Sequence, residues 1–365
     1  MYNNYSDSEK IALVFAHQGV SNAKFFQVWN LFDGFQDFLS NFENNSTAKK
    51  LLAANFPPIV TALKRKLADE YIKELNQYGI VAVTCFSDSY PQALHQIDDK
   101  PYLLYCKGDL SLLGSDCLAV VGTRKVSTYG RRVTKDFTAV LSEYFTIVSG
   151  LAYGVDAIAH ETTLENEGKT IAVLGSGLLN VYPSSHQNLA DKIVANGGLL
   201  VSEYGLMEEP LAYHFPARNR IVSALSKGLL VCQAPEKSGT NSTVEFALEQ
   251  GKDVFVIPGE VYDMGFKGSN RLIKSMQGAC VTTPRDIVDY YNLDSYKNAT
   301  QSYQLSIEEQ MIVNVLTDGQ LGFDQIVQQT QLSPVEVLFL LSNLELRNII
   351  TKLPGNSYQL CGGLE

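Results

Sequence analysis

The amino-acid sequence predicts an α/β protein with a doubly wound, mainly parallel sheet, preceded by a helical segment and followed by a winged helix-turn-helix. In the middle of the 365-residue chain, short apolar stretches alternate with helix-length amphipathic stretches such as residues 131–144 and 243–250. Strands that are apolar on both faces and separated by helices are typical of a parallel sheet covered on both sides. The composition agrees, because 45% of the residues are hydrophobic and 19% are charged, as in ordinary globular proteins.

Residues 1–71 carry a helical pattern, with bulky anchors such as Phe25 and Trp29 at helical spacing. Residues 17–20, His-Gln-Gly-Val, separate two of the expected helices. This turn fits either a helix-hairpin-helix motif, whose backbone amides can meet a phosphate, or a plain connection between two helices. The plain connection is favoured, since Lys24 is the only Lys or Arg near the turn.

Seven short apolar stretches in the central region predict the strands of the sheet. They lie at residues 79–84, 117–121, 146–148, 170–174, 199–202, 228–232 and 253–257. In a doubly wound sheet, ligands bind at the edge formed by the carboxyl ends of the strands. The residues that directly follow each strand are therefore the first candidates for a site.

A polar stretch, residues 292–304, predicts a linker between the sheet region and a compact tail. The tail predicts three helices, at residues 307–316, at 323–329 and from Ser333 onward, followed by a hairpin over 349–360. Three helices and a hairpin are typical of a winged helix-turn-helix. The chain is thus expected to divide into residues 1–71, 72–291, 292–304 and 305–365.

The winged helix is expected to contact protein and not duplex DNA. Residues 305–365 hold two basic and seven acidic side chains, a net charge of −5. The third helix is rich in apolar residues and carries a single arginine, Arg347. A helix that reads duplex DNA needs donors for base edges and cations for phosphates.

The whole chain holds 29 Lys plus Arg and 39 Asp plus Glu, a net charge of −10. Bulk charge alone argues against binding to nucleic acid unless cations are concentrated locally. No apolar run approaches the roughly 20 residues of a membrane span, and the first residues lack a signal-peptide pattern. The six cysteines are scattered, and the five histidines lack metal-ligand spacing. We expect a cytoplasmic protein with no metal, no cofactor and no association with membranes.

The first chemically informative turn follows the predicted strand at residues 117–121. Gly122 permits a tight turn, and Ser127 or Thr128 can cap the next helix. Free backbone amides at a helix start form an anion site. Five cations lie within twelve residues there, and no acid precedes Asp136. They are Arg124, Lys125, Arg131, Arg132 and Lys135. The sequence therefore predicts phosphate binding at this turn.

A second glycine turn follows the predicted strand at residues 146–148. Gly150 and Gly154 let the backbone approach a ligand closely. Asp156 can cap the helix that leads to His160, and this structural role alone would account for the aspartate.

Residues 175–177, Gly-Ser-Gly, are similar to the start of a dinucleotide-binding fingerprint. The third glycine position is occupied by Asn180, and Pro183 delays the next helix. A pyrophosphate needs the helix to begin directly after the glycines, so this chain is not expected to bind a dinucleotide.

Residues 215–220, Phe-Pro-Ala-Arg-Asn-Arg, lead into an apolar helix. Guanidinium groups grip phosphates in a forked geometry, and a phenylalanine face can stack on an unpaired base. Arg218 and Arg220 beside Phe215 therefore favour contact with single-stranded nucleic acid. The competing interpretation is a capped helix with two arginines that only face solvent.

Small hydroxyl residues and a glycine follow the predicted strand at 228–232. Ser238, Gly239 and Thr240 begin this run and predict another anion-binding helix start. The sequence contains no nucleophile elbow, zinc-protease motif or Walker lysine loop. We therefore expect loops that hold phosphates without catalysis, in a protein that is not an enzyme.

In order and spacing, these motifs resemble the DNA-processing protein A family (DprA, also called Smf). The resemblance rests on residues 122–124, 149–156, 215–220 and 256–259 and covers roughly residues 75–290. It implies an extended Rossmann-like domain that binds single-stranded DNA and forms a homodimer. It also implies protection of incoming strands and loading of the recombinase RecA during natural transformation. The N-terminal helical domain, of the SAM or helix-hairpin-helix type, and the winged helix suit longer members.

The resemblance also assigns residues, with Phe215 as the base-stacking aromatic. The rest of the implied single-stranded DNA site is Gly122, Thr123, Arg124, Lys125, Ser127, Arg131, Ser149, Gly150, Gly154, Gly175, Ser176, Gly177, Arg218, Asn219, Arg220, Ser238, Gly239 and Thr240. The implied dimer surface spans residues 270–281 and includes Asn270, Leu272, Ile273 and Val281. The chain departs from the family pattern at residues 238–243 and at Lys252, where an arginine is usual.

A nucleotide-cleaving enzyme is the alternative function. Residues 238–245 share the spacing of the GGxGTxxE motif of the lysine-decarboxylase-like phosphoribohydrolases, in which the glutamate, here Glu245, helps catalysis. Ser238 and Asn241 replace two of that motif's glycines, and the rest of the chain does not follow that family. A scaffold protein that binds no nucleotide is a third and weaker hypothesis.

Overall fold

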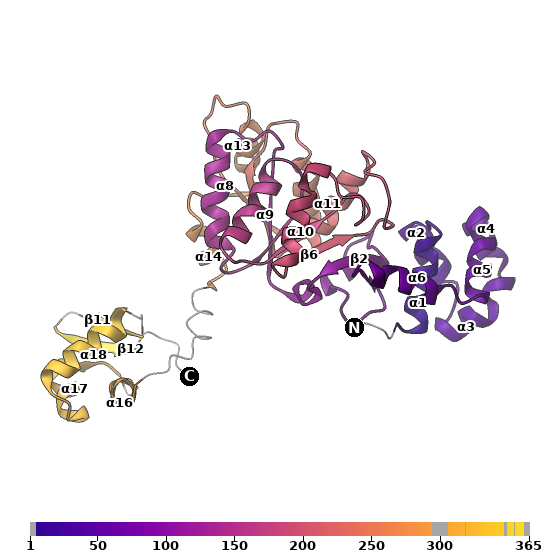
Figure 1. Cartoon of the computed structure of the whole chain (residues 1–365). Helices are drawn as coiled ribbons and strands as arrows, with labels where there is room; N and C mark the ends of the chain where they lie inside the picture. Colours follow the sequence, from indigo (N-terminus) through magenta and orange to yellow (C-terminus); the bar gives the residue numbers. More distant parts are fainter. Residues whose placement is uncertain (1–4, 294–305, 318, 347–348, 354, 361–365) are drawn as a thin grey trace. The chain divides into compact units, whose positions relative to one another are not determined.

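The computed structural model describes residues 5–293, 306–317, 319–346, 349–353 and 355–360. The chain divides into two compact units, residues 1–287 and 288–365 (Figure 1). Most of the expected linker, residues 292–304, lies outside the described residues, as does Arg347 of the expected third helix of the tail.

The first unit is built on a nine-stranded sheet with the order β1-β2-β6-β5-β4-β3-β7-β8-β9. From β6 to β9, neighbouring strands run parallel, whereas β2 pairs antiparallel with both β1 and β6. The expected doubly wound, mainly parallel sheet is confirmed. The strands are β1 (Val81–Thr84), β2 (Leu103–Gly108), β3 (Cys117–Gly122), β4 (Thr146–Ser149), β5 (Thr170–Val173), β6 (Leu199–Ser202), β7 (Gly228–Gln233), β8 (Asp253–Val256) and β9 (Ala279–Cys280).

Helices cover both faces of the sheet, and successive strand residues alternate between two cores. Ala172 and Leu200 join the core under α9 and α10, while Ile171 and Val201 join the core under α11 and α12. This alternation is the pleat of a strand that is buried on both sides. The helices of this region are α7 (Gln92–His95), α8 (Thr128–Leu141), α9 (Val155–Glu165), α10 (Gln187–Ala195), α11 (His214–Ala224), α12 (Thr240–Glu249), α13 (Lys267–Lys274) and α14 (Arg285–Tyr290).

The N-terminal segment is helical, as expected, and its helices gather beside the β2 end of the sheet (Figure 1). A capping box between Ser6 and Glu9 starts the first of them. The helices share one core with the sheet, and Phe25 stacks on Tyr102 with ring centroids 4.1 Å apart. The helices are α1 (Asp7–His17), α2 (Asn22–Trp29), α3 (Gly34–Asn41), α4 (Ser46–Leu52), α5 (Phe56–Lys64) and α6 (Ala68–Gln77). The expected boundary at residue 71 therefore falls inside α6.

The turn between α1 and α2 connects the two helices without offering an anion site. The backbone amides of Gln18, Gly19 and Val20 all donate to carbonyl groups of α1. Because these donors are already used, the turn has none of the three left for a phosphate. The structure thus favours the plain connection over the helix-hairpin-helix alternative.

The second unit is a winged helix, as the sequence predicts. Its three-stranded sheet has the order β10-β12-β11 and packs on three helices through a core that includes Ile312, Ile326 and Leu341. Its helices are α16 (Ile307–Leu316), α17 (Phe323–Thr330) and α18 (Pro334–Leu346), and its strands are β10 (Leu321–Gly322), β11 (Ile350–Leu353) and β12 (Ser357–Leu360). Among the described residues, no helix combines the length and apolar character needed to cross a bilayer.

Candidate nucleic-acid interface

Four of the predicted turns follow β5, β4, β3 and β7, which are consecutive neighbours in the sheet. Because these strands are parallel, their carboxyl ends form one edge, here called the strand edge, and their turns lie side by side. The fifth predicted motif, residues 215–220, lies in α11, whose side chains contact the turn after β4, the end of β5 and the first turn of α12.

Arg124 and Phe215 meet at the strand edge. The Cζ atom of Arg124 lies 5.5 Å from the centroid of the Phe215 ring, in cation–π geometry. Arg124 and its neighbour Lys125 are exposed, and neither forms an ion pair with a described residue. Arg131 and Arg132, on the first turns of α8, are also exposed. An uncommitted cation beside an aromatic face can hold a phosphate while a base stacks on the ring.

Gln233, the last residue of β7, holds the first loop in place. Its backbone carbonyl accepts a hydrogen bond from the N–H of Thr123 at 2.8 Å. Its side-chain oxygen accepts from the N–H of Ser127 at 2.9 Å, and the Ser127 hydroxyl caps α8 by accepting from Gly130. Gln233 is not among the site residues predicted from the sequence, although a polar residue that ends an apolar strand at the candidate edge was an available signal.

Two glycines allow the loops to pack closely. Gly154 has a φ of +79°, and a Cβ there would lie 2.3 Å from the carbonyl oxygen of Thr123. Gly175 lies against Phe215, whose ring atom Cδ1 would be 3.0 Å from an added Cβ. Any side chain at Gly154 would therefore push the first and second loops apart, and one at Gly175 would displace the aromatic ring.

Arg218 points inward, contrary to the expectation of a direct phosphate contact. Its side chain is buried, and Nη1 donates to the carbonyl of Gly150 at 2.7 Å and to that of Val173. The guanidinium thus ties the ends of β4 and β5 together. Burial lowers the pKa of Arg218 to about 10, and the nearby carboxylate of Asp156 opposes that shift. The group stays charged at neutral pH.

Asp156 braces the second loop and does not cap α9 as expected. The helix begins after Gly154, so Asp156 lies in its first turn. Its Oδ2 atom accepts from the backbone N–H of Gly150 at 3.2 Å and of Ala152 at 3.4 Å. Burial raises the pKa of Asp156, and the charge of Arg218 opposes the rise. Asp156 and Arg218 therefore fix the same loop from two sides.

Arg220 is also turned inward, so its expected contact with phosphate gives way to a positioning role. Its Nη1 and Nη2 atoms donate to the two carboxylate oxygens of Glu203, at 2.8 and 2.6 Å. Its Nε atom donates to the carbonyl of Asp99 at 2.7 Å. Both Arg220 and Glu203 are nearly solvent-free, at 6% and 9% side-chain exposure. The bidentate pair anchors α11 to the end of β6.

The remaining predicted residues divide by exposure. Those already hydrogen-bonded inside the protein include Ser149, which donates to the carbonyl of Val120, and Ser176, which donates to that of Asn180. Asn219 donates to the Ser242 hydroxyl at 3.0 Å and so connects α11 to the first turn of α12. The buried members of the expected set are Thr123, Ser149, Gly150, Gly175, Ser176, Gly177, Arg218, Arg220 and Thr240, and the exposed ones are Arg124, Lys125, Arg131 and Gly239.

The residues expected at a dimer surface are only partly available. Leu272 and Val281 are each 3% exposed and belong to the protomer's own interior. Asn270 is occupied by two hydrogen bonds to the backbone of Gly259, and Ile273 is half-buried. The family resemblance gave Leu272 and Ile273 as the apolar contacts, without showing that Leu272 faces inward. The exposed apolar residues around α13 are instead Val261, Tyr262, Met264 and Met276.

Sequence models of two families match the chain. The model of DNA recombination-mediator protein A matches residues 81–292, and that of the DprA winged helix domain matches residues 297–356. The chain belongs to the DNA recombination-mediator protein A family. The DprA resemblance drawn from the glycine turns and the residues 215–220 is therefore confirmed.

In the described part of the chain, no cluster of His, Cys, Asp or Glu is arranged to hold a metal ion.

Relatives and solved structures of the DprA family agree with this assignment. Protein Smf of Escherichia coli (strain K12) is 38% identical over 308 residues, which cover 81% of this chain and 82% of that protein. DNA processing protein DprA of Streptococcus pneumoniae is 45% identical over 217 residues, covering 59% and 75%.

Two DprA structures superpose on this one. The X-ray structure of S. pneumoniae DprA does so with a TM-score of 0.65 and 33% identity, over 78% of this chain and 98% of that one. DNA processing protein A of Helicobacter pylori, solved for its single-stranded DNA binding mode, gives a TM-score of 0.54 and 31% identity over 59% and 96%.

Proposed function

We propose that this protein binds single-stranded DNA along the strand edge and acts as a recombination mediator. The observation that carries the proposal is the uncommitted Arg124 over the Phe215 ring, 5.5 Å from its centroid. Phosphates would meet Arg124, Lys125 and Arg131, while an unpaired base stacks on Phe215. The H. pylori relative, solved for its single-stranded DNA binding mode, supports the same chemistry for this chain.

Buried residues behind the strand edge would serve this function indirectly. Gln233, Arg218 and Asp156 hold the loops in one arrangement before any ligand arrives. A site that is already ordered loses little conformational entropy on binding, so more of the contact energy is expressed as affinity.

The test is a fluorescence anisotropy titration with a labelled oligo-dT at about 50 and 200 mM salt. Arg124→Ala should weaken binding about tenfold at the lower salt and reduce the salt dependence, because one phosphate contact is lost. Phe215→Leu should reduce the free energy of oligo-dT binding by about 1–3 kcal/mol, because a stacking face for a base is lost. Arg65→Ala, which removes an exposed arginine from the N-terminal helices, is the matched control. Binding unchanged by Arg124→Ala and Phe215→Leu would rule out this site.

The finer function we propose is loading of RecA onto single strands during natural transformation, inside the cytoplasm. Purified protein should let RecA assemble on single-stranded DNA that is coated with single-strand-binding protein, measured as the DNA-dependent ATPase of RecA. The Arg124→Ala variant should lose this stimulation, and Arg65→Ala should keep it. Equal stimulation by both variants would show that RecA loading does not depend on Arg124 at the strand edge.

We also propose that the protein acts as a homodimer through the exposed apolar residues around α13. Tyr262 and Met276 are 89% and 94% exposed, and exposed apolar side chains that gather in one region mark candidate interaction sites. Tyr262→Glu with Met276→Glu should shift the sedimentation coefficient to that of a monomer. Leu248→Glu, at an exposed position of α12, is the control. An unchanged coefficient in the double variant would place the dimer contact elsewhere.

The enzymatic alternative is decided by one assay. Glu245 lies exposed on α12, and Asn241, at a replaced glycine of the hydrolase motif, bonds the carbonyl of Glu236. We propose no catalytic role for Glu245. Release of free base from nucleoside monophosphates, abolished by Glu245→Gln, would instead favour a phosphoribohydrolase.

A further inference from the structure

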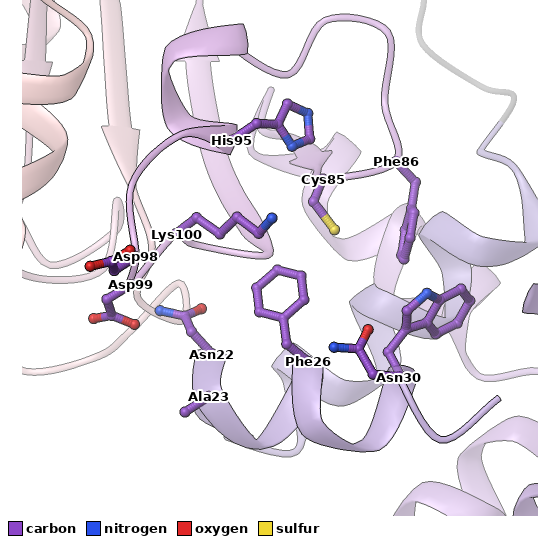
Figure 2. A pocket seen from close by; sticks show the side chains of 11 residues that line it. Asn22, Ala23, Phe26, Asn30, Cys85, Phe86, His95, Asp98, Asp99 and Lys100 are labelled. Carbon is purple, nitrogen blue, oxygen red and sulfur yellow. The ribbon is translucent and has the colours of Figure 1, made fainter. Parts of the chain in front are cut away.

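Two adjoining pockets lie between the N-terminal helices and the sheet, away from the residues proposed to touch DNA. They share Asn22 and Asp99, and their volumes are about 730 and 940 Å³. We call them together the seam groove. The smaller pocket is lined by α2 and by the segments around α7, with Phe26, Cys85 and Lys100 directed into it (Figure 2). The larger runs past α1, α6 and the loop over residues 203–213.

The floor of the seam groove is apolar and aromatic. In the larger pocket, Val20, Leu75, Tyr102 and Tyr105 are buried lining residues. In the smaller pocket, Trp29 and Phe86 form an aromatic wall, with ring centroids 4.7 Å apart. These side chains give a surface on which apolar groups of a ligand can be buried.

The loop over residues 203–213 adds apolar side chains that are open to solvent. Met207 and Tyr213 are each 68% exposed, and Leu211 is 36% exposed, and all three line the groove. Methionine and tyrosine are adaptable contact residues that are enriched where proteins bind one another. Because all three line the same pocket, they favour a peptide or protein as the ligand.

The rim of the seam groove is acidic. Six carboxylates and two side-chain cations line it. The carboxylates are Glu74, Asp98, Asp99, Glu203, Glu208 and Glu209, and the cations are Lys100 and Arg220. Arg220 is already paired with Glu203, and burial lowers the pKa of His17, which keeps that ring neutral near pH 7. The net negative charge repels nucleic acid and favours a cationic ligand.

A separate observation marks the groove wall as incomplete. His214, the first residue of α11, lines the larger pocket and is 5% exposed, yet its Nδ1 atom has no hydrogen-bond partner among the residues that the structure describes. A buried polar atom without a partner costs free energy, and a group entering the groove can recover that cost.

We propose that the seam groove binds a basic, amphipathic peptide segment of a partner protein. Apolar side chains of the segment would rest on the aromatic floor, and its Lys or Arg side chains would meet Glu74, Glu208 and Glu209 at the rim. This surface is distinct from the strand edge, so the proposal goes beyond single-stranded DNA binding.

The probe is a fluorescein-labelled amphipathic helical peptide of about 18 residues, with leucine on one face and arginine on the other. A peptide of the same pattern with glutamate in place of arginine is the ligand control. The full chain should bind the arginine peptide at least about tenfold more tightly than the glutamate peptide, measured by anisotropy. Equal affinities for the two peptides would overturn the proposal.

Two double variants distinguish the groove from general attraction between a basic peptide and an acidic protein. Glu208→Gln with Glu209→Gln should weaken binding of the arginine peptide at least about fivefold. Tyr213→Ser should also weaken binding of this peptide. Glu161→Gln with Glu249→Gln removes the same charge from exposed positions outside the groove and should change little. Equal weakening by both double variants would overturn the proposal.

A second readout locates the peptide and separates this proposal from the DNA site. Bound peptide should slow amide hydrogen exchange over residues 203–213 and 71–75, and no protection there would contradict the groove. The groove variants should still bind oligo-dT like the unmodified chain. Failure of the peptide experiment therefore leaves the Arg124 titration as an independent test of the strand edge.

Discussion

Buried polar side chains decide how the strand edge is built, and Arg218 shows why sequence alone misjudged them. An arginine beside an asparagine and an aromatic residue fits both a phosphate contact and an internal brace. The brace is set by carbonyl groups of Gly150 and Val173, which are 68 and 45 residues away in the chain. Local pattern carries no information about such distant partners, so the residues were predictable but the direction of the side chain was not.

Replacing Arg218 should lower the stability of the protein, because this side chain braces the strand edge from inside and does not contact DNA directly. Arg218→Leu leaves two carbonyl groups and the buried Asp156 without their partner, which should lower the unfolding free energy by about 3–5 kcal/mol. Arg124→Ala, at an exposed position, should change it by less than about 0.5 kcal/mol. Urea unfolding of the variants measures both. A fully stable Arg218→Leu variant that fails to bind oligo-dT would show that this guanidinium meets DNA directly.

His160 should make the stability of the first unit depend on pH. Its Nδ1–H donates to Thr170, whose own hydroxyl proton is used on the carbonyl of Ile147, and burial lowers the His160 pKa to about 3. The unfolded chain takes up this proton below about pH 6.5, whereas the folded chain does not. The stabilisation is therefore complete above pH 6.5 and falls as pH decreases, by about 1.4 kcal/mol per unit.

Urea unfolding at pH 7 and pH 5 tests this prediction. About 2 kcal/mol of the difference between the unfolding free energies at the two pH values should come from His160. His160→Gln should be less stable at both values but should lose that part of the pH dependence. An unchanged difference between the two pH values in the variant would assign the effect to other groups.

At the scale of elements, the apolar runs predicted seven of the nine strands, and the two missed strands have different explanations. Residues 102–106, which overlap most of β2, are an apolar run between Pro101 and Gly108, so the signal was present. β9 has only two residues and leaves no pattern. The antiparallel pairing of β2 with both β1 and β6 depends on partners distant in sequence and was not predictable.

The contact between the first two loops gives a prediction about one glycine. Gly154→Ala forces a side chain into a positive φ and against the Thr123 carbonyl, so it should destabilise the chain by about 1–3 kcal/mol and weaken oligo-dT binding. Gly114→Ala is the matched control, because open space surrounds that position and it lies outside the expected DNA site. Thermal unfolding and anisotropy provide the two measurements. Similar behaviour of the two variants would mean that the loops separate at little cost.

At the scale of the whole molecule, the net charge of −10 conceals an uneven distribution. The uncommitted cations Arg124, Lys125 and Arg131 lie at the strand edge, whereas residues 305–365 carry a net charge of −5. On α18, the exposed side chains include Val335, Leu338 and Phe339, at 78%, 54% and 66%. An acidic unit with an apolar exposed helix face is suited to protein contacts, and the contact with protein expected from the sequence stays a prediction.

Removing the winged helix should therefore leave DNA binding intact. A chain lacking residues 303–365 should bind oligo-dT and duplex DNA at moderate salt with the affinities of the full chain, because the deleted unit has a core of its own and few cations. Anisotropy with both DNA forms is the measurement. Loss of duplex affinity on deletion would show that the winged helix reads DNA.

Two neighbouring residues of α11 belong to different sites. His214 lines the seam groove, and Phe215 lies under Arg124 at the strand edge. Arg220, about one and a half turns further along, fixes the same helix to Glu203. A ligand in the groove that displaced α11 as one body would alter the affinity for a ligand at the strand edge. Thermodynamic reciprocity then requires the strand to change peptide affinity by the same factor as the peptide changes strand affinity. The helix would thus make the acidic groove an allosteric input to the handling of DNA.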